Sequence, residues 1–135
     1  MAFPTKYHNR RCWSALLKRH FDSEAERKYG EHLFARQMNG EISDLAFQVR
    51  WDCEVNGVRI GNRYMRLDFR YFDGQLAEMV WDDYKGFATP EWKLKADIWA
   101  AGGPGVLRIT RKAPKASPLS YVHDEIRPIR PTIKE

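Results

Sequence analysis

The chain has 135 residues, of which 43% are hydrophobic and 13% aromatic, and its formal net charge is +5. This length and apolar content favour one domain with a packed core and argue against disorder. The positive charge favours an anionic partner such as nucleic acid, while the lack of a long apolar run argues against a membrane partner and a secretory leader. Cys12 and Cys53 lack the spacing of a zinc site, so we expect reduced thiols and a cytoplasmic protein.

The first well-defined element is a helix from about residue 23 to 38. The basic segment before it contains 13–21, which fit either a short strand pair or one helical turn. Ser23 and Glu26 have the spacing of a capping box, and Asn39-Gly40 is a typical helix stop. Glu26 also falls on the inner face of the predicted helix. Two roles stay open for its carboxylate: a cap for the Ser23 amide, or an acid in an active site.

Three strands are predicted next. Apolar and polar residues alternate over 45–55 and again over 63–72, and Asn56-Gly57 is typical of a turn between them. Residues 76–85 form the third strand. Because Met79-Val80-Trp81 is apolar on both faces, we expect this strand to be central in the sheet.

A second helix and a short strand follow. Thr89 and Pro90 predict the start of a helix that ends before Gly102-Gly103-Pro104, and 106–110 form the last strand. The order helix, three strands, helix, strand predicts an α/β fold with a mixed central sheet flanked by helices.

The predicted domain covers residues 1–110, with its core at about 21–110. The remaining 111–135 hold four of the seven prolines and show no apolar period. We therefore expect an extended C-terminal arm that the core does not need for folding.

Charged residues gather where the third strand ends. Asp83 and Lys85 point the same way and lie about 6.6 Å apart along the strand, while Asp68 lies on the preceding strand. Two carboxylates and an ammonium group are costly to bury together, and a divalent cation such as Mg²⁺ would relieve that cost. Asp82 points to the opposite face, where we expect it to be solvated or salt-bridged.

This arrangement resembles the D…(D/E)-x-K motif of the restriction-endonuclease-like nucleases, whose α-β-β-β-α-β core has the predicted order. The chain further resembles a family of small phage-encoded proteins of unknown function that is grouped with these nucleases. The likeness covers roughly 6–110 and lies in four short motifs that occur in the family's order. These are FDSEAE (Phe21–Glu26), GEISDLAFQV (Gly40–Val49), DFRY (Asp68–Tyr71) and DDYKG (Asp82–Gly86).

The resemblance implies roles for individual residues. Asp68 and Asp83 would be metal ligands with the Tyr84 carbonyl, Lys85 the catalytic lysine that orients the attacking water, and Glu26 the acid from the first helix. The chain departs from the superfamily pattern in having Leu67 where proline is frequent before the first aspartate. Asp83 itself replaces a commoner glutamate.

The turn dipeptide Asp73-Gly74 conflicts with a shared metal ion. A two-residue turn would pair Asp68 with Met79 and leave Asp68 and Asp83 roughly 13 Å apart. The carboxylate site requires a loop nearer six residues, about 73–78, or a bulge that shifts the register. We therefore expect one of these two arrangements rather than the two-residue turn.

Five polar residues are candidates for contacting nucleic acid, each with a plainer alternative. For the arginines the alternative is neutralisation of Asp68, and for the lysines it is a solvated face, since charged residues on a helix usually face solvent. Four of the five tryptophans, at 51, 81, 92 and 99, fit a core better than base stacking. The candidates are Arg66, Arg70, Lys93, Lys95 and Gln48.

Together these features predict a DNA endonuclease that depends on Mg²⁺ or Mn²⁺. Backbone contacts carry no sequence information, so we expect structure-selective cleavage of branched DNA, as by a Holliday-junction resolvase, and paired cuts would require a homodimer. Two other interpretations stay open. The protein could bind nucleic acid on this fold without catalysis, or it could bind a host or phage protein through its C-terminal arm.

Overall fold

The computed structural model describes residues 11–84 and 89–129, and within them the chain forms two helices, a two-stranded sheet and a five-stranded mixed sheet. The predicted order of helix, three strands, helix and strand is present. A hairpin precedes this series and a further strand follows it, so the strand pair is the correct alternative for 13–21. The elements are β1 Cys12–Ser14, β2 Arg19–Phe21, α1 Glu24–Met38, β3 Ile42–Val55, β4 Val58–Asp73, β5 Glu78–Tyr84, α2 Pro90–Gly102, β6 Val106–Lys112 and β7 Tyr121–Ile126.

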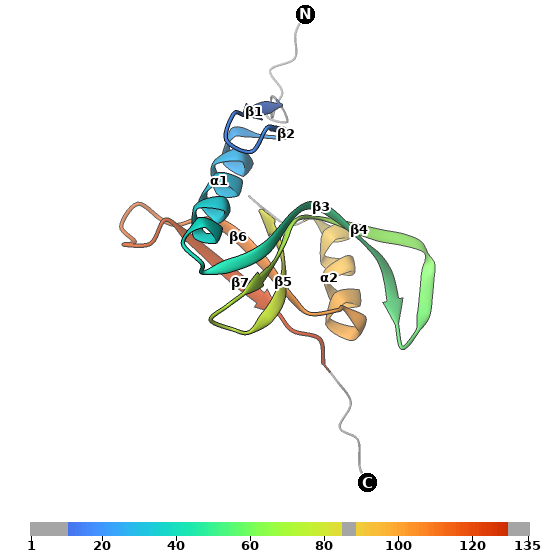
Figure 1. Cartoon of the computed structure of the whole chain (residues 1–135). Helices are drawn as coiled ribbons and strands as arrows, with labels where there is room; N and C mark the ends of the chain where they lie inside the picture. The colour runs from blue at the N-terminus through green and yellow to red at the C-terminus, as the bar shows by residue number, and fades with distance from the viewer. Residues whose placement is uncertain (1–10, 85–88, 130–135) are drawn as a thin grey trace, which may run out of the picture.

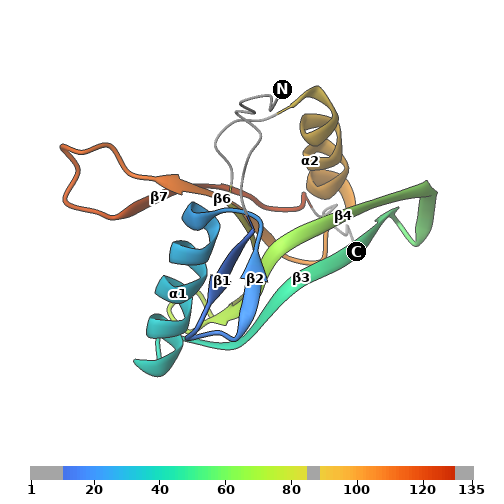
Figure 2. The ribbon, with the colours of Figure 1, turned by 90° about the horizontal axis from the view of Figure 1, so that it is seen from above.

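The five-stranded sheet has the order β3-β4-β5-β6-β7. Strands β5 and β6 are parallel, and the other neighbouring pairs are antiparallel. Helix α2 makes the crossover that a parallel pair requires. The two helices lie on opposite sides of this sheet (Figures 1 and 2).

Each helix covers its own hydrophobic cluster. Tyr29 and Leu33 of α1 pack with Val80 on one face of the sheet, and Trp99 of α2 packs with Trp81 on the other. Neighbouring residues of β5 thus enter different clusters, as predicted for a central strand buried on both faces. Within the part of the chain that is described, no helix has the length and apolar character needed to cross a membrane.

Local signals set the start of both helices. Ser23 Oγ accepts a hydrogen bond from the Glu26 amide at 3.0 Å, and Thr89 Oγ1 accepts one from the Trp92 amide at 3.1 Å. Gly30 then allows α1 to lie close against the sheet. A Cβ there would come within 3.1 Å of the Phe21 ring and 3.2 Å of the Phe69 ring.

The loop between β4 and β5 is longer than its turn dipeptide predicted. Asp73 pairs with Glu78, so residues 74–77 form the loop, and Asp73 Oδ1 accepts hydrogen bonds from the amides of Gln75 and Leu76 at 2.9 and 3.1 Å. The two-residue turn is therefore wrong. Phe69 pairs with Asp82, and the next pair in this register places Asp68 opposite Asp83, as the carboxylate site requires.

The prediction of an extended C-terminal arm is wrong for 111–112 and 121–126, which belong to the five-stranded sheet. Strand β6 continues to Lys112, and β7 pairs with it along its whole length. Arg108 binds Glu125 across this pair at 3.0 Å, and the Ile129 amide donates to the Ala100 carbonyl at 2.9 Å. The domain therefore does not end at residue 110. The prolines of this segment lie in the β6–β7 loop and after β7, whereas 121–126 contain none.

Candidate active site

Three carboxyl groups from three different elements meet at the end of β5. Glu26 comes from the first turn of α1, Asp68 from β4 and Asp83 from β5. The Asp68 carboxyl is hydrogen-bonded to both Glu26 and Asp83. Glu26 and Asp83 are only 7% and 2% exposed. Residues more than 50 positions apart in the chain thus form one acidic cluster.

Main-chain groups hold Asp68 and Asp83 in place. The Tyr84 amide donates to Asp68 Oδ2 at 2.9 Å, and the Asp68 amide donates a longer bond to Asp83 Oδ1 at 3.4 Å. These bonds lie just beyond the last backbone pair between β4 and β5. From α2, Trp92 Nε1 donates to Asp83 Oδ2 at 3.2 Å. The two aspartates are therefore ordered by both strands and by the second helix.

The Glu26 carboxylate is turned toward the sheet. Its Oε2 accepts a long hydrogen bond of 3.4 Å from the Asp22 amide, and its carboxyl group bonds to that of Asp68. Only the backbone amide of Glu26 is used in the bond to Ser23 Oγ. Capping of α1 and participation in the acidic cluster are thus carried by different atoms of this residue.

The electrostatics of the cluster follow from burial and crowding. Burial raises the pKa of Glu26, while the bond to Asp68 opposes part of that rise. The pKa of Asp68 is raised well above its ordinary value, first by burial and then by the negative charge of Asp83. Like charges held this close favour a shared proton or a bound cation.

The donor set fits a hard divalent cation in its chemistry. Carboxylate oxygens are the ligands that Mg²⁺ prefers, and Mg²⁺ keeps several waters besides one or two carboxylates. Among residues 11–84 and 89–129, no group of three or more His, Cys, Asp or Glu side chains is placed so that it could hold a metal ion. The carboxyl groups are instead joined to one another by hydrogen bonds, which a cation would have to replace.

Lys85 and Tyr84 were also predicted to belong to this site. Lys85 lies outside the described residues. Tyr84 is at the site through its amide, which binds Asp68, and its ring packs on the α1 side of the sheet near Tyr29 and Tyr121.

Asp82 is not solvated, contrary to the sequence prediction. It is fully buried and accepts hydrogen bonds from the hydroxyls of Tyr29 at 2.5 Å, Tyr71 at 2.7 Å and Thr110 at 2.7 Å. The alternation of β5 correctly placed Asp82 opposite to Asp83. The error came from α1, which covers that face and brings Tyr29 onto it.

The predicted nucleic-acid-binding residues are only partly brought together. Arg66 pairs across the strands with Arg50, and Arg50 lies 4.1 Å from the centre of the Tyr64 ring. Lys95 reaches the same ring at 5.8 Å and also pairs with Glu91 at 3.4 Å. Arg50 and Tyr64 were missed, although strand alternation places Arg50 on the same face as Gln48.

The other candidates are more scattered. Lys93 is exposed on α2, and Gln48 is exposed with a positive φ of 52° at the β3 position across from Asp68. Arg70 pairs with Ala46 and Trp81 in the sheet, and its Nε is buried without a hydrogen-bond partner among the described residues. The arrangement therefore offers a basic strip along β3, β4 and α2 rather than one compact patch.

Comparison of the chain with protein-family models, curated proteins and solved structures finds no match in any of the three.

Proposed function

We propose that the protein is a metal-dependent phosphodiesterase that cleaves DNA, with an α-β-β-β-α-β core of the restriction-endonuclease type. The observation that carries this proposal is the convergence of Glu26, Asp68 and Asp83 from α1, β4 and β5. Charged groups are rarely crowded and buried without a task, and perturbed pKa values are typical of functional sites.

Each residue has a distinct role in this proposal. Asp68 and Asp83, with the Tyr84 carbonyl, would hold Mg²⁺ or Mn²⁺, which supplies Lewis acidity and activates water toward phosphate. Trp92 orients Asp83 through its indole N–H, and Glu26 adds a third negative charge beside Asp68. Lys85, two residues after Asp83, would orient the attacking water.

The surroundings of the cluster favour DNA as the substrate. Arg66 lies two positions before Asp68 on β4 and pairs with Arg50 of β3, and Arg50 and Lys95 of α2 meet at the Tyr64 ring. Such groups bind phosphates without reading bases, which supports structure-selective cleavage of branched DNA. Paired cuts at a four-way junction would require two copies of the chain.

The proposal is tested by incubating the purified protein with linear, nicked and four-way-junction DNA. Cleavage is expected with Mg²⁺ or Mn²⁺ and not with EDTA, and the junction should be cut fastest. An Asp68→Asn variant serves as the matched control for a contaminating nuclease. Equal cleavage by wild type and Asp68→Asn would reject the assigned site.

A nucleic-acid-binding protein without catalysis is the second candidate. It is favoured by the present arrangement of the carboxyl groups, which bond to one another and do not form a metal site among the described residues. This candidate predicts DNA binding that divalent metal does not alter. Binding of a host or phage protein through an extended arm has weaker support, because 121–126 belong to the sheet.

A further inference from the structure

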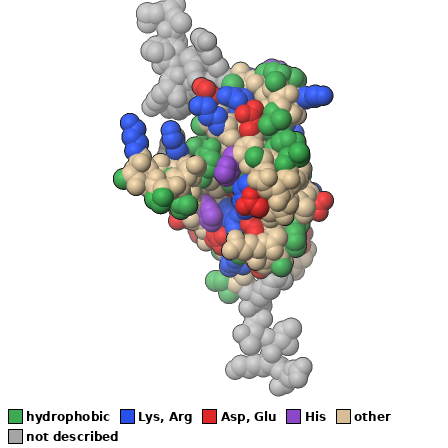
Figure 3. Space-filling model, turned by 60° about the vertical axis from the view of Figure 1, so that its left-hand side comes forward, with side chains coloured by type: hydrophobic (Ala, Val, Ile, Leu, Met, Phe, Trp, Pro, Cys, Tyr) green, Lys and Arg blue, Asp and Glu red, His purple; other side chains and the backbone are tan. Residues whose placement is uncertain are grey.

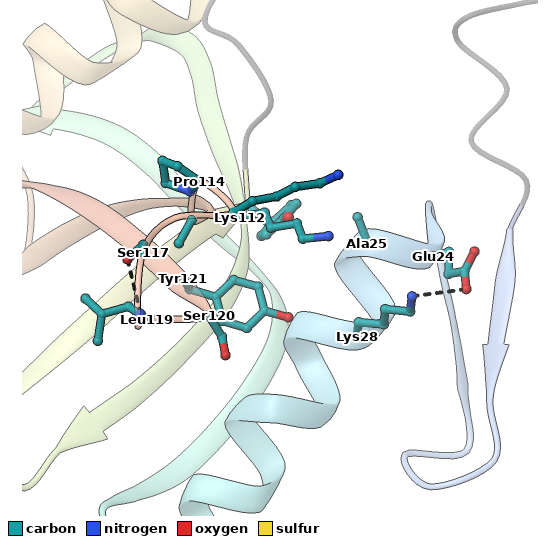
Figure 4. Close-up of a pocket in the computed structure, with 12 residues that line it drawn as sticks. Glu24, Ala25, Lys28, Lys112, Pro114, Ser117, Leu119, Ser120 and Tyr121 are labelled. Atoms are coloured by element: carbon teal, nitrogen blue, oxygen red, sulfur yellow. Dashed lines mark hydrogen bonds and ion pairs between the residues drawn. The ribbon is translucent and has the colours of Figure 1, made fainter.

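A basic groove opens beside the acidic cluster. It has a volume of about 430 Å³ and lies between the first turns of α1 and the loop that joins β6 to β7 (Figure 4). That loop projects from the body of the molecule (Figures 1 and 2). Lys28 enters from the helix and Lys112 from the end of β6, while Tyr121 lies on the strand side.

The groove carries a net positive charge. Its lining residues include Lys28, Lys112 and Lys115 against one carboxylate, Glu24. Lys28 pairs with Glu24 at 3.5 Å, whereas Lys112 and Lys115 are exposed. The face in Figure 3 shows lysine or arginine side chains on the projecting lobe and on the body next to it. The groove therefore attracts an anion.

The groove and the acidic cluster share two elements. On α1, Glu24 and Ala25 line the groove and Glu26 belongs to the cluster. On β5, Tyr84 lines the groove and Asp83, the residue before it, belongs to the cluster. The groove and the cluster therefore adjoin at the first turn of α1 and at the end of β5, where Tyr84 faces the groove and Asp83 faces α2. A strand that continues from the groove past the end of β5 would approach the carboxyl groups.

We propose that this groove binds the sugar-phosphate backbone of a nucleic-acid strand and leads that strand to the acidic cluster. Delivery of the strand to the cluster rests on the proposed function, whereas binding in the groove itself requires no metal. Lysines bind phosphates, the hydroxyls of Ser117 and Ser120 can donate to phosphate oxygens, and the rings of Tyr84 and Tyr121 offer stacking surfaces. An acidic protein segment would use the lysines but not the stacking surfaces.

The test is fluorescence anisotropy with labelled oligothymidylate in EDTA, so that cleavage plays no part. The variant pair Lys112→Gln/Lys115→Gln removes two charges from the groove. The control pair Lys18→Gln/Arg59→Gln also removes two exposed charges, but from residues outside the groove lining. Thermal melting of both pairs checks that they remain folded.

The Lys112→Gln/Lys115→Gln variant (the groove pair) is expected to bind oligothymidylate on the order of tenfold more weakly. The slope of the logarithm of its binding constant against the logarithm of salt concentration should become shallower by about 1.4, since each lost phosphate contact removes about 0.7 for a single strand. The control pair should change the slope much less. Equal losses in the two pairs, or no loss in the groove pair, would overturn the proposal. So would displacement of the oligonucleotide by polyglutamate at equal charge concentration, which would assign the groove to acidic proteins.

The two proposals fail in different ways. Groove-dependent binding in EDTA, together with no cleavage in Mg²⁺, would support the groove and reject the nuclease. Metal-dependent cleavage that the groove pair retains, with unchanged oligonucleotide binding, would support the nuclease and reject the groove.

Discussion

Asp68 and Asp83 each accept a hydrogen bond from the main chain of the other's strand: the Tyr84 amide donates to Asp68, and the Asp68 amide donates to Asp83. These bonds continue the β4–β5 pairing by side chains beyond its last backbone pair, Phe69 with Asp82. The two carboxylates are therefore placed by the sheet itself. A site built on strands in this way is held more firmly than one on loops.

The first prediction concerns Asp83 and Lys85. Asp83→Asn and Lys85→Ala should each lower metal-dependent cleavage by at least about 100-fold, a loss typical of removing one electrostatic group from a catalytic site. Asparagine keeps an acceptor oxygen for Trp92 Nε1, so folding and DNA binding should change little. Cleavage kinetics and anisotropy in EDTA measure the two effects separately. Wild-type rates in both variants would show that the site is assigned wrongly.

The second prediction separates the two roles of Glu26. Glu26→Gln keeps the amide that binds Ser23 Oγ but removes a charge beside Asp68. Without metal, the melting temperature should stay the same or rise, because like charges repel. The increase in melting temperature on adding Mg²⁺, which measures binding to the folded state, should shrink.

Glu24→Gln is the matched control for this experiment, because Glu24 lies in the same helical turn and its carboxylate faces Lys28 instead. It should keep the wild-type response to Mg²⁺. A drop in metal-free stability of Glu26→Gln with an unchanged Mg²⁺ response would return Glu26 to a structural role.

Much of the fold could be predicted from local patterns. Capping residues fixed the starts of α1 and α2, and alternation identified β3 and β4. The tight turn at Asp73-Gly74 was wrong because Asp73 uses its carboxylate to cap the longer loop, which a dipeptide rule does not consider. Strand β7 was missed because 121–126 show no apolar period, whereas its pairing with β6 is formed by the backbone ladder and carries the ion pair of Arg108 with Glu125.

The candidate site was predicted in part for similar reasons. Strand parity placed Asp83 opposite to Asp82, the motif resemblance joined Asp83 to Asp68, and helix periodicity turned Glu26 inward. The environment of Asp82 could not be predicted, because its partners Tyr29, Tyr71 and Thr110 come from three other elements. The sequence offered one hint, since Tyr29 follows Glu26 by three positions on the inner face of α1.

The third prediction concerns the buried Asp82. Asp82→Ala removes the acceptor for three hydroxyl groups that stay buried, so it should lower the free energy of unfolding by about 3 kcal/mol. Urea unfolding measures this loss. The exposed Asp97→Ala should cost less than about 0.5 kcal/mol. A similar small cost for Asp82→Ala would mean that the hydroxyls find other acceptors.

The fourth prediction follows from the corrected C-terminal boundary. A chain ending at residue 110 loses β7, which exposes the edge of β6, and it also loses Glu125, one of the two carboxylate partners of Arg108. It should be unfolded or aggregated by circular dichroism and size-exclusion chromatography. A chain ending at residue 129 should remain folded. A folded, monomeric 1–110 chain would contradict the structural role of β7.

The fifth prediction is a pH dependence from the same ion pairs. Burial raises the pKa of Asp73 and of Glu125, but their bonding partners outweigh it, so that both pKa values are lowered. The Leu76 amide and Arg108 lower the pKa of Asp73, and Arg108 lowers the pKa of Glu125. A carboxylate with a lowered pKa stabilises the fold above its unfolded pKa, and this contribution is lost as pH falls through the folded value. Stability from this network should therefore decline below about pH 4.

Urea unfolding of wild type and Glu125→Gln over a pH series isolates this contribution from other carboxyl groups. Wild type should be the more stable at neutral pH, and the difference should vanish in strong acid. A difference that stays constant across the series would mean that Glu125 stabilises by packing alone.

The central claim is that Asp68 and Asp83 bind a divalent cation beside Glu26, and titration with Mn²⁺ followed by electron paramagnetic resonance tests it most directly. We expect one bound Mn²⁺ per wild-type chain, displaced by excess Mg²⁺. Binding should be lost in Asp68→Asn and Asp83→Asn but kept in the exposed Asp97→Asn. Mn²⁺ that stays free with the wild-type chain, or that binds equally well to all three variants, would contradict the account.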